Sequence, residues 1–143
     1  MGTVRVLLVD DHTMVRRGLR RILESTDGLE VIDEAGDGTQ AVLAAVKLKP
    51  DIVLMDVGLP GMSGIEATRR IAATVPEARV LMLSIHADEH YVQQSMAAGA
   101  KGYLLKDADA QELVTAIIAV CRGGTYRHAA LGANPQLAGP RTS

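Results

Sequence analysis

The chain has 143 residues and a formal net charge of −2, which suits one compact domain and disfavours nucleic-acid binding, because nucleic-acid-binding domains normally present a basic face. It is 48% hydrophobic but only 2% aromatic, without Phe or Trp, so its core must be built from aliphatic side chains. A single cysteine, Cys121, excludes an internal disulfide, and no apolar run reaches the roughly 20 residues of a membrane helix, so we expect a soluble, cytoplasmic protein without membrane association.

Two kinds of apolar segment alternate along the chain. Short runs rich in β-branched residues predict strands, and the longer stretches between them have the spacing of helices with one apolar face. In chain order we expect a strand at 4–9, a helix at 15–23, a strand at 30–34, a helix at 41–48, a strand at 51–55, a helix at 65–73, a strand at 79–83, a helix at 89–98, a strand at 102–105 and a helix at 113–121.

Turn residues and strand composition predict how these elements are arranged. Pro50 and Gly99 each follow a predicted helix, where such residues end helices. The runs at 4–9, 51–55 and 79–83 are almost continuously apolar, which is typical of parallel strands buried on both faces. Strands that alternate with helices form a parallel sheet covered on both sides. We therefore expect a doubly wound α/β domain with five parallel strands and with five helices on two faces.

The chain changes character near residue 123. Glycine and proline recur from there to Ser143, and no apolar periodicity is sustained. We expect the folded domain to cover residues 1–125 and residues 126–143 to form a linker or a disordered tail.

Polar side chains follow the predicted strands at the point where each strand ends. Asp10 and Asp11 follow the first strand, Asp56 the third, Ser84 the fourth and Lys106 the fifth. In an open parallel sheet the carboxyl ends of the strands form the ligand-binding edge, so these side chains should meet there. Three carboxylates repel one another unless a cation lies among them, and oxygen ligands suit Mg²⁺. A carboxylate beside Mg²⁺ and a lysine can act as a nucleophile toward a phosphoryl group.

Each of these residues also has a plainer explanation. An Asp-Asp pair after a strand can cap the next helix, and a lone Asp at a strand end is more often a turn residue than a nucleophile. A serine or a lysine alone carries little information. The functional hypothesis therefore depends on all five residues meeting at one edge of the sheet. Among the histidines, we expect His12 to begin a helix rather than to bind metal, and we expect His90 and His128 at the surface.

Several segments together form a specific pattern. The main ones are VLLVDDH at 6–12, DIVLMDVGLPGMSG at 51–64, LS at 83–84 and GAKGYLLK at 99–106. With them the stretch from about residue 4 to 122 resembles a bacterial two-component response-regulator receiver domain. Three further segments resemble the NarL/FixJ type of receiver: HADEHY at 86–91, KD at 106–107 and GGTY at 123–126.

The resemblance implies a fold and a metal site. The fold would be the flavodoxin-like receiver fold, with strand order 2-1-3-4-5. Asp56 would be the phosphoacceptor. Asp11, Asp56 and the backbone carbonyl of Gly58 would bind Mg²⁺, with Asp10 acting partly through water.

The resemblance also assigns roles around the phosphoryl group. Lys106 would contact its oxygens, and Ser84 would form a hydrogen bond to one of them. Tyr103 would be an aromatic switch that turns inward as Ser84 moves toward the phosphoryl group. Gly58 and His86 would flank the path of a hydrolytic water, and the small Gly58 would leave that path open.

The implied function is a signalling switch rather than an enzyme. A sensor histidine kinase would supply the phosphoryl group, and the domain would catalyse only its own phosphorylation and dephosphorylation. A face formed by the fourth helix, the fifth strand and the fifth helix would then bind a partner or a second copy in a homodimer.

The output of the switch is open to two readings. Regulators of this type continue into a helix-turn-helix DNA-binding domain, which we expect to be absent from this chain. We favour control of transcription through that domain, because the resemblance is to that subfamily; a stand-alone receiver that acts by protein contact is the alternative.

Two rival functions fit the sequence less well. An aspartyl-nucleophile phosphatase of the haloacid dehalogenase type would need a second acid where the chain has Gly58. A flavodoxin-like cofactor carrier would need a phosphate-binding loop in place of Asp10 and Asp11.

Overall fold

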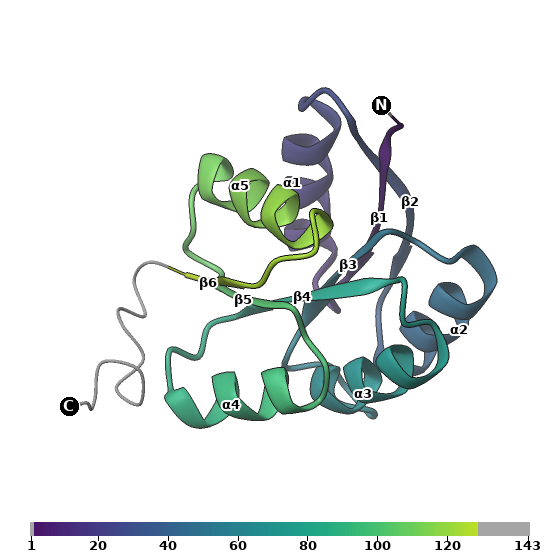
Figure 1. Ribbon diagram of the computed structural model, residues 1–143, viewed down its shortest axis with the longest axis vertical. Coiled ribbons are helices and arrows are strands. Elements are labelled where there is room, and N and C mark those ends of the chain that lie inside the picture. The colour runs from purple at the N-terminus through teal and green to yellow at the C-terminus, as the bar shows by residue number, and fades with distance from the viewer. Residues whose placement is uncertain (1, 129–143) are drawn as a thin grey trace.

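The computed structural model describes residues 2–128, in which strands and helices alternate along the chain (Figure 1). This part of the chain contains no helix with both the length and the apolar character needed to cross a membrane. The strands are β1 (Val4–Val9), β2 (Leu29–Ala35), β3 (Ile52–Asp56), β4 (Arg79–Ser84), β5 (Gly102–Leu105) and β6 (Tyr126–Arg127). The helices are α1 (Thr13–Glu24), α2 (Gly38–Leu48), α3 (Gly64–Thr74), α4 (Glu89–Ala97) and α5 (Ala110–Cys121).

All the strands pair in parallel, in the order β2-β1-β3-β4-β5-β6. The order of the first five strands agrees with the predicted 2-1-3-4-5, so the doubly wound receiver fold is confirmed. The central strand β3 is buried along its whole length. In its register Met55 lies opposite Val9 of β1 and opposite Met82 of β4. The carboxyl ends of β1, β3 and β4 therefore lie at the same edge of the sheet.

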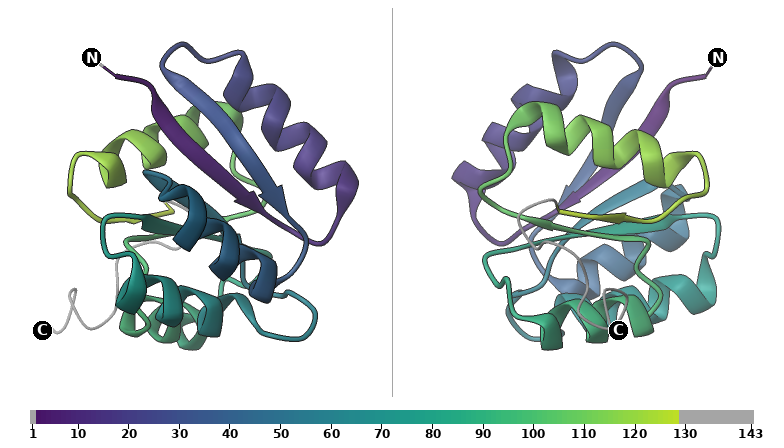
Figure 2. Two further views of the ribbon diagram at one scale, coloured as in Figure 1. Left: turned by 90° about the vertical axis from the view of Figure 1, so that its right-hand side faces the viewer. Right: turned by 60° about the vertical axis from the view of Figure 1, so that its left-hand side comes forward.

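The prediction of five strands is wrong by one, because β6 extends the sheet beside β5 (Figure 2). Gly102 of β5 pairs with Tyr126, and Tyr103 pairs with Arg127. A strand of two residues has no alternation that a sequence pattern could reveal. Strand β6 also lies beyond residue 125, where the folded domain was expected to end. Of the expected tail, residues 129–143 lie outside the described part of the chain.

Helices cover both faces of the sheet, as predicted. Helices α1 and α5 lie on one face, and α2, α3 and α4 lie on the other (Figure 1). Successive strand residues point to opposite faces, so each strand contributes to two cores. Leu8 and Leu54 pack into the core under α1 and α5, whereas Val9 and Met55 pack into the core under the other three helices. These buried side chains are aliphatic, as the composition requires.

Four of the helices begin at a side-chain cap. Asp37, Ser63, Asp88 and Asp109 precede α2, α3, α4 and α5, and each accepts a hydrogen bond from a backbone N–H of the first turn. Helix α1 begins after His12, as predicted, but the side chain of His12 makes no capping bond. Its imidazole instead contacts the acidic residues at the end of β1.

Candidate functional site

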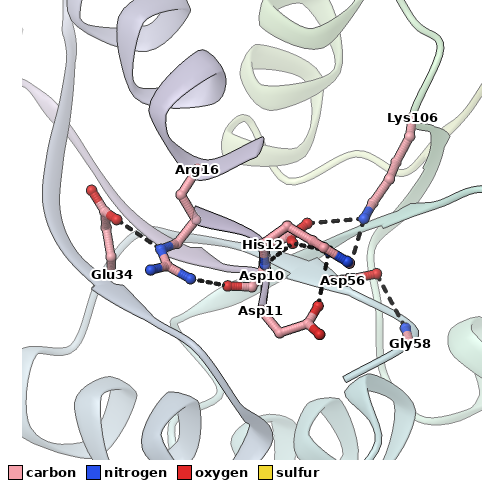
Figure 3. Close-up of polar contacts among 8 residues, drawn as sticks. All are labelled: Asp10, Asp11, His12, Arg16, Glu34, Asp56, Gly58 and Lys106. Atoms are coloured by element: carbon pink, nitrogen blue, oxygen red, sulfur yellow. Dashed lines mark hydrogen bonds and ion pairs between the residues drawn. The ribbon is translucent and has the colours of Figure 1, made fainter. Parts of the chain in front are cut away.

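The structure brings the predicted polar residues together at the carboxyl edge of the sheet, and Figure 3 shows Asp10, Asp11, Asp56 and Lys106 of this set. Asp10 follows β1, Asp56 ends β3, Ser84 ends β4 and Lys106 follows β5. Asp10, Asp56 and Ser84 are only 1%, 5% and 1% exposed. These groups come from strands that are neighbours in the sheet but far apart in the sequence, so the fold alone creates the cluster.

The ammonium group of Lys106 lies between two carboxylates. Its Nζ is 2.9 Å from Oδ2 of Asp10 and 3.3 Å from Oδ2 of Asp56. Desolvation acts to lower the pKa of Lys106, but the hydrogen bond to Asp10 and the charges of both carboxylates outweigh it and raise that pKa overall. Lys106 is therefore held firmly in its charged form at neutral pH.

The Asp56 carboxyl group has a pKa raised above its ordinary value. Burial is the main cause, and the negative charge of Asp10 adds to it. The backbone N–H of Gly58, which donates to Oδ1 of Asp56 at 3.1 Å, and the charge of Lys106 offset only part of this effect. The surrounding protein thus compensates the negative charge of ionised Asp56 only in part, and a cation bound nearby would stabilise that charge.

A set of ligand atoms fit for a metal ion lies beside Asp56. One atom from each of Asp10, Asp11, His12 and Asp56 falls within 4.8 Å of the others. The three carboxylates offer hard oxygen ligands, which suit Mg²⁺, and Asp56 also lines a pocket. Nδ1 of His12 lies 3.1 Å from a carboxylate oxygen of Asp10 and 3.1 Å from one of Asp11, so His12 balances part of their charge when it is protonated.

A pocket of about 140 Å³ opens over the Asp56 carboxylate. The side toward Gly58 is open, because a Cβ added at this glycine would meet no atom within 4 Å. The residues that line the pocket are His12, Asp56, Gly58, Ser84, Ile85, His86 and Lys106.

The loop after β4 is held to the interior by two hydrogen bonds. The backbone N–H of His86 donates to Oγ of Ser84 at 2.9 Å, and the hydroxyl of Tyr103 donates to the carbonyl of His86 at 2.8 Å. The Tyr103 side chain is fully buried. The His86 ring stacks on Tyr91 of α4, with ring centroids 4.2 Å apart. Ser84, His86 and Tyr103 thus form one connected unit beside the pocket.

Sequence reasoning missed the residue that fixes the loop after β1. Arg16 donates a hydrogen bond to the main-chain carbonyl of Asp10, and its Nε lies 2.9 Å from Oε1 of Glu34 on β2 (Figure 3). Arg20 binds the other oxygen of Glu34 at 2.7 Å. The i, i+4 spacing of the two arginines is a signal for a shared helix face, but nothing in the sequence identifies Glu34 as their partner.

The prediction for His128 is wrong, since this residue is buried rather than at the surface. It is 5% exposed, and its Nδ1 accepts a hydrogen bond from the backbone N–H of Leu105 at 2.7 Å. His90, the other histidine expected at the surface, is exposed. His128 lies in a segment without apolar periodicity, so no pattern could have indicated that it packs against β5.

Comparison with known proteins identifies the family. Residues 6–118 match the response regulator receiver domain. The transcriptional regulatory protein DegU of Brevibacillus brevis is 42% identical over 125 residues, which are 87% of this chain and 53% of DegU. The chain spans about half the length of the curated relatives that it matches.

Solved structures agree with this result. The signal receiver domain of NarL from Mycobacterium tuberculosis is 34% identical, with a TM-score of 0.83 over 86% of this chain and 99% of that chain. A chain of the CheX–CheY–BeF3–Mg²⁺ complex from Borrelia burgdorferi is 32% identical, with a TM-score of 0.77 over 81% of this chain and 87% of that chain. The present chain therefore belongs to the response regulator receiver domain family of two-component systems and is of the NarL/FixJ type.

Proposed function

We propose that Asp56 is reversibly phosphorylated, with a phosphohistidine of a sensor kinase as the donor. The observation that carries this proposal is the setting of the Asp56 carboxylate, which is buried at a pocket between an ammonium group and further carboxylates. A carboxylate oxygen of Asp56 attacks phosphorus, the phosphorus–nitrogen bond breaks, and the imidazole of the donor leaves. Attack by water on the resulting aspartyl phosphate releases inorganic phosphate and restores the carboxylate.

The acidic cluster is the proposed site for Mg²⁺. Asp10, Asp11 and Asp56 would hold the ion, with the backbone carbonyl of Gly58 as a further ligand and with Asp10 acting partly through water. The proximity of the carboxylates supports this assignment, and so does the presence of Mg²⁺ in the related complex from Borrelia burgdorferi. When bound, Mg²⁺ supplies positive charge for the carboxylates and for the oxygens of the phosphoryl group.

Two further side chains are proposed to bind the phosphoryl group. Lys106 already contacts Asp56, so its ammonium group can bind a phosphoryl oxygen once that carboxylate is phosphorylated. The Ser84 hydroxyl lines the same pocket and can donate a hydrogen bond to another oxygen. Both groups stabilise charge that increases as the phosphoryl group arrives.

The switch would run from Ser84 to the surface next to β5. Movement of the Ser84 hydroxyl toward a phosphoryl oxygen would release the backbone of His86, which Tyr103 also binds. Tyr103 would therefore respond to phosphorylation, and α4, β5 and α5 would change the face that binds a partner or a second copy of the chain. Strand β6 pairs with β5 at the edge of the sheet and would take part in this change.

The output of the switch is proposed to be control of transcription. The matched relative DegU is a transcriptional regulatory protein, and it is about twice as long as the matched segment. We propose that the segment beyond residue 128 links the receiver to a DNA-binding domain. A stand-alone receiver that acts through protein contacts is the alternative.

Phosphorylation by acetyl phosphate tests the proposal directly. Intact-protein mass spectrometry should show one added phosphoryl group in the presence of Mg²⁺ and none after chelation of the metal. Peptide mapping should place this group on Asp56. Phosphorylation of a different residue, or equal uptake with and without Mg²⁺, would overturn the assignment of the site.

Enlarging Gly58 should prolong the life of the phosphorylated form. A Gly58→Leu side chain would enter open space beside Asp56 and obstruct the approach of water. We expect dephosphorylation to slow by roughly three- to tenfold, because attack depends on close alignment of the water. The rate of phosphate release from the purified phosphoprotein measures this effect, and Gly58→Ala is the matched control with little added bulk. An unchanged rate in Gly58→Leu would contradict the role given to this position.

A further inference from the structure

The main chain at the end of β5 is held by hydrogen bonds on both sides. The backbone N–H of Lys106 donates to the carbonyl of Ser84 on the β4 side at 2.8 Å. On the opposite side, the backbone N–H of Leu105 donates to Nδ1 of His128 at 2.7 Å. Since Lys106 directly follows Leu105, the two bonds fix the peptide segment that carries the ammonium group of the site.

The His128 ring supplies the hydrogen-bond acceptor that a longer strand β6 would offer to β5. The backbone N–H of Tyr126 donates to the carbonyl of Lys101 at 3.0 Å, and that of His128 donates to the carbonyl of Tyr103 at 2.9 Å. Every second residue of β5 faces this edge, so the next donor is the N–H of Leu105. An imidazole rather than a main-chain carbonyl accepts from it. A buried N–H that lost this acceptor would be strongly disfavoured, so Leu105 would have to move.

The helices on either side of β6 hold the ring and its strand in place. Because Nδ1 of His128 accepts a hydrogen bond, the ring proton is on Nε2, which lies 3.2 Å from Oε1 of Glu112 on α5. The hydroxyl of Tyr126 donates to the other oxygen of Glu112 at 2.8 Å. On the far side, Nη2 of Arg127 lies 2.9 Å from Oε1 of Glu89 on α4. The contact of Nε2 with Glu112 thus orients the His128 ring, and Nδ1 of the same ring accepts the hydrogen bond from Leu105.

We propose that His128 is a positioning residue for Lys106 and acts through the main chain of Leu105. The proposal rests on the proposed function, in which the Lys106 ammonium group binds phosphoryl oxygens. A displacement of about 1 Å in such a group can reduce a rate strongly. The coupling is reciprocal: if docking of His128 favours the phosphorylated form, phosphorylation favours the docking of His128 by the same factor. The docking of His128 against β5 is therefore energetically coupled to the phosphorylation of Asp56.

Two conservative variants separate the functions of the two ring nitrogens. His128→Asn keeps an oxygen acceptor close to the position of Nδ1, whereas His128→Gln places its amide near Nε2 and Glu112. With acetyl phosphate and Mg²⁺, His128→Ala and His128→Gln should be phosphorylated about three- to tenfold more slowly than the wild type. His128→Asn should retain most of the rate. A merely structural role would make the rates follow the thermal midpoints of the variants instead.

Arg127→Ala is the matched control, because it removes the contact of β6 with α4 and leaves the bond between His128 and Leu105 intact. It should be phosphorylated at the wild-type rate. Amide hydrogen exchange followed by NMR should show that Leu105 is protected in the wild type and in His128→Asn, and exchanges faster in His128→Ala. In the wild type this protection should increase on phosphorylation.

Three results would overturn the proposal. His128→Ala could be phosphorylated at the wild-type rate, Arg127→Ala could be slowed as much as His128→Ala, or His128→Gln could retain the rate as well as His128→Asn does. Failure of the proposed function is distinguishable from these results, since the wild type itself would then take up no phosphoryl group on Asp56.

Discussion

The Asp56→Asn protein should take up no phosphoryl group and should also be more stable than the wild type. The amide has the size of the carboxyl group but is not a nucleophile and carries no charge. Burial and the charge of Asp10 raise the pKa of Asp56, so its ionised form destabilises the metal-free fold at neutral pH. We expect the thermal midpoint of Asp56→Asn to rise by a few degrees without metal. Calorimetry measures this gain, and mass spectrometry measures the loss of phosphorylation.

The gain in stability should increase with pH. The folded-state pKa of Asp56 is raised, so the unfolded chain releases this proton at a lower pH than the folded protein does. Below the unfolded-state pKa both states are protonated, and Asp56 costs no stability. Between the two pKa values the wild type loses stability as the pH rises, and above the folded-state pKa the full cost remains. The advantage of Asp56→Asn should therefore vanish in acid and be complete above the folded-state pKa of Asp56.

Mg²⁺ should reduce the difference between the two proteins. The ion stabilises the folded wild type in proportion to its binding, and Asp56→Asn lacks one of the proposed carboxylate ligands. Asp27→Asn, at an exposed position, is the control and should change neither phosphorylation nor stability appreciably. Equal stability of the wild type and Asp56→Asn at neutral pH without metal would contradict the interpretation of the electrostatics.

Gly64→Ala should destabilise the fold and also slow phosphorylation of the protein that remains folded. A Cβ on Gly64 would lie 1.9 Å from the carbonyl oxygen of Asp56 and 2.9 Å from its carbonyl carbon. The backbone N–H of Gly64 also donates to the carbonyl of Val57 at 3.1 Å, so α3 cannot withdraw without losing this bond. We expect a loss of about 3 kcal/mol in the free energy of unfolding, measured by urea denaturation.

Gly18→Ala is the matched control for this substitution. Gly18 lies inside α1, and a Cβ there would meet no atom within 4 Å. Alanine should therefore stabilise the protein, by up to about 1 kcal/mol, because it favours the helix. Phosphorylation of Gly64→Ala should be assayed at a temperature where circular dichroism shows a folded protein. Wild-type stability of Gly64→Ala would mean that the approach of α3 to Asp56 is looser than described.

The parts of the fold that follow from periodic patterns could be predicted from the sequence. The bounds of β1 and β5 agree with the predicted strands, and the helices were found with errors of a few residues at their ends. One bound differs by a single residue. Asp51 was expected to begin a strand, and β3 begins at Ile52, although the backbone N–H of Asp51 donates to the carbonyl of Arg5 on β1 at 2.9 Å. The clustering of Asp10, Asp56 and Lys106 followed from topology, since parallel strands end at one edge.

The parts that could not be predicted depend on contacts between single residues distant in the sequence. Arg16 reaches Asp10 and Glu34, and His128 reaches Leu105 from 23 residues away. Such contacts leave no periodicity, and each residue type is compatible with an exposed position. Strand β6 falls in the same class, because it is defined by its pairing with β5 rather than by its own composition.

The placement of the tyrosines has an optical consequence. The chain has three tyrosines and no tryptophan or phenylalanine. Tyr91 of α4 stacks on His86, Tyr103 lies in β5, and Tyr126 of β6 binds Glu112. Near-ultraviolet absorption and emission therefore come almost wholly from α4, β5 and β6, and β1, β2 and α2 contribute none. The native chain thus carries an intrinsic spectroscopic reporter, whose signal would follow rearrangement beside β5 without any added label.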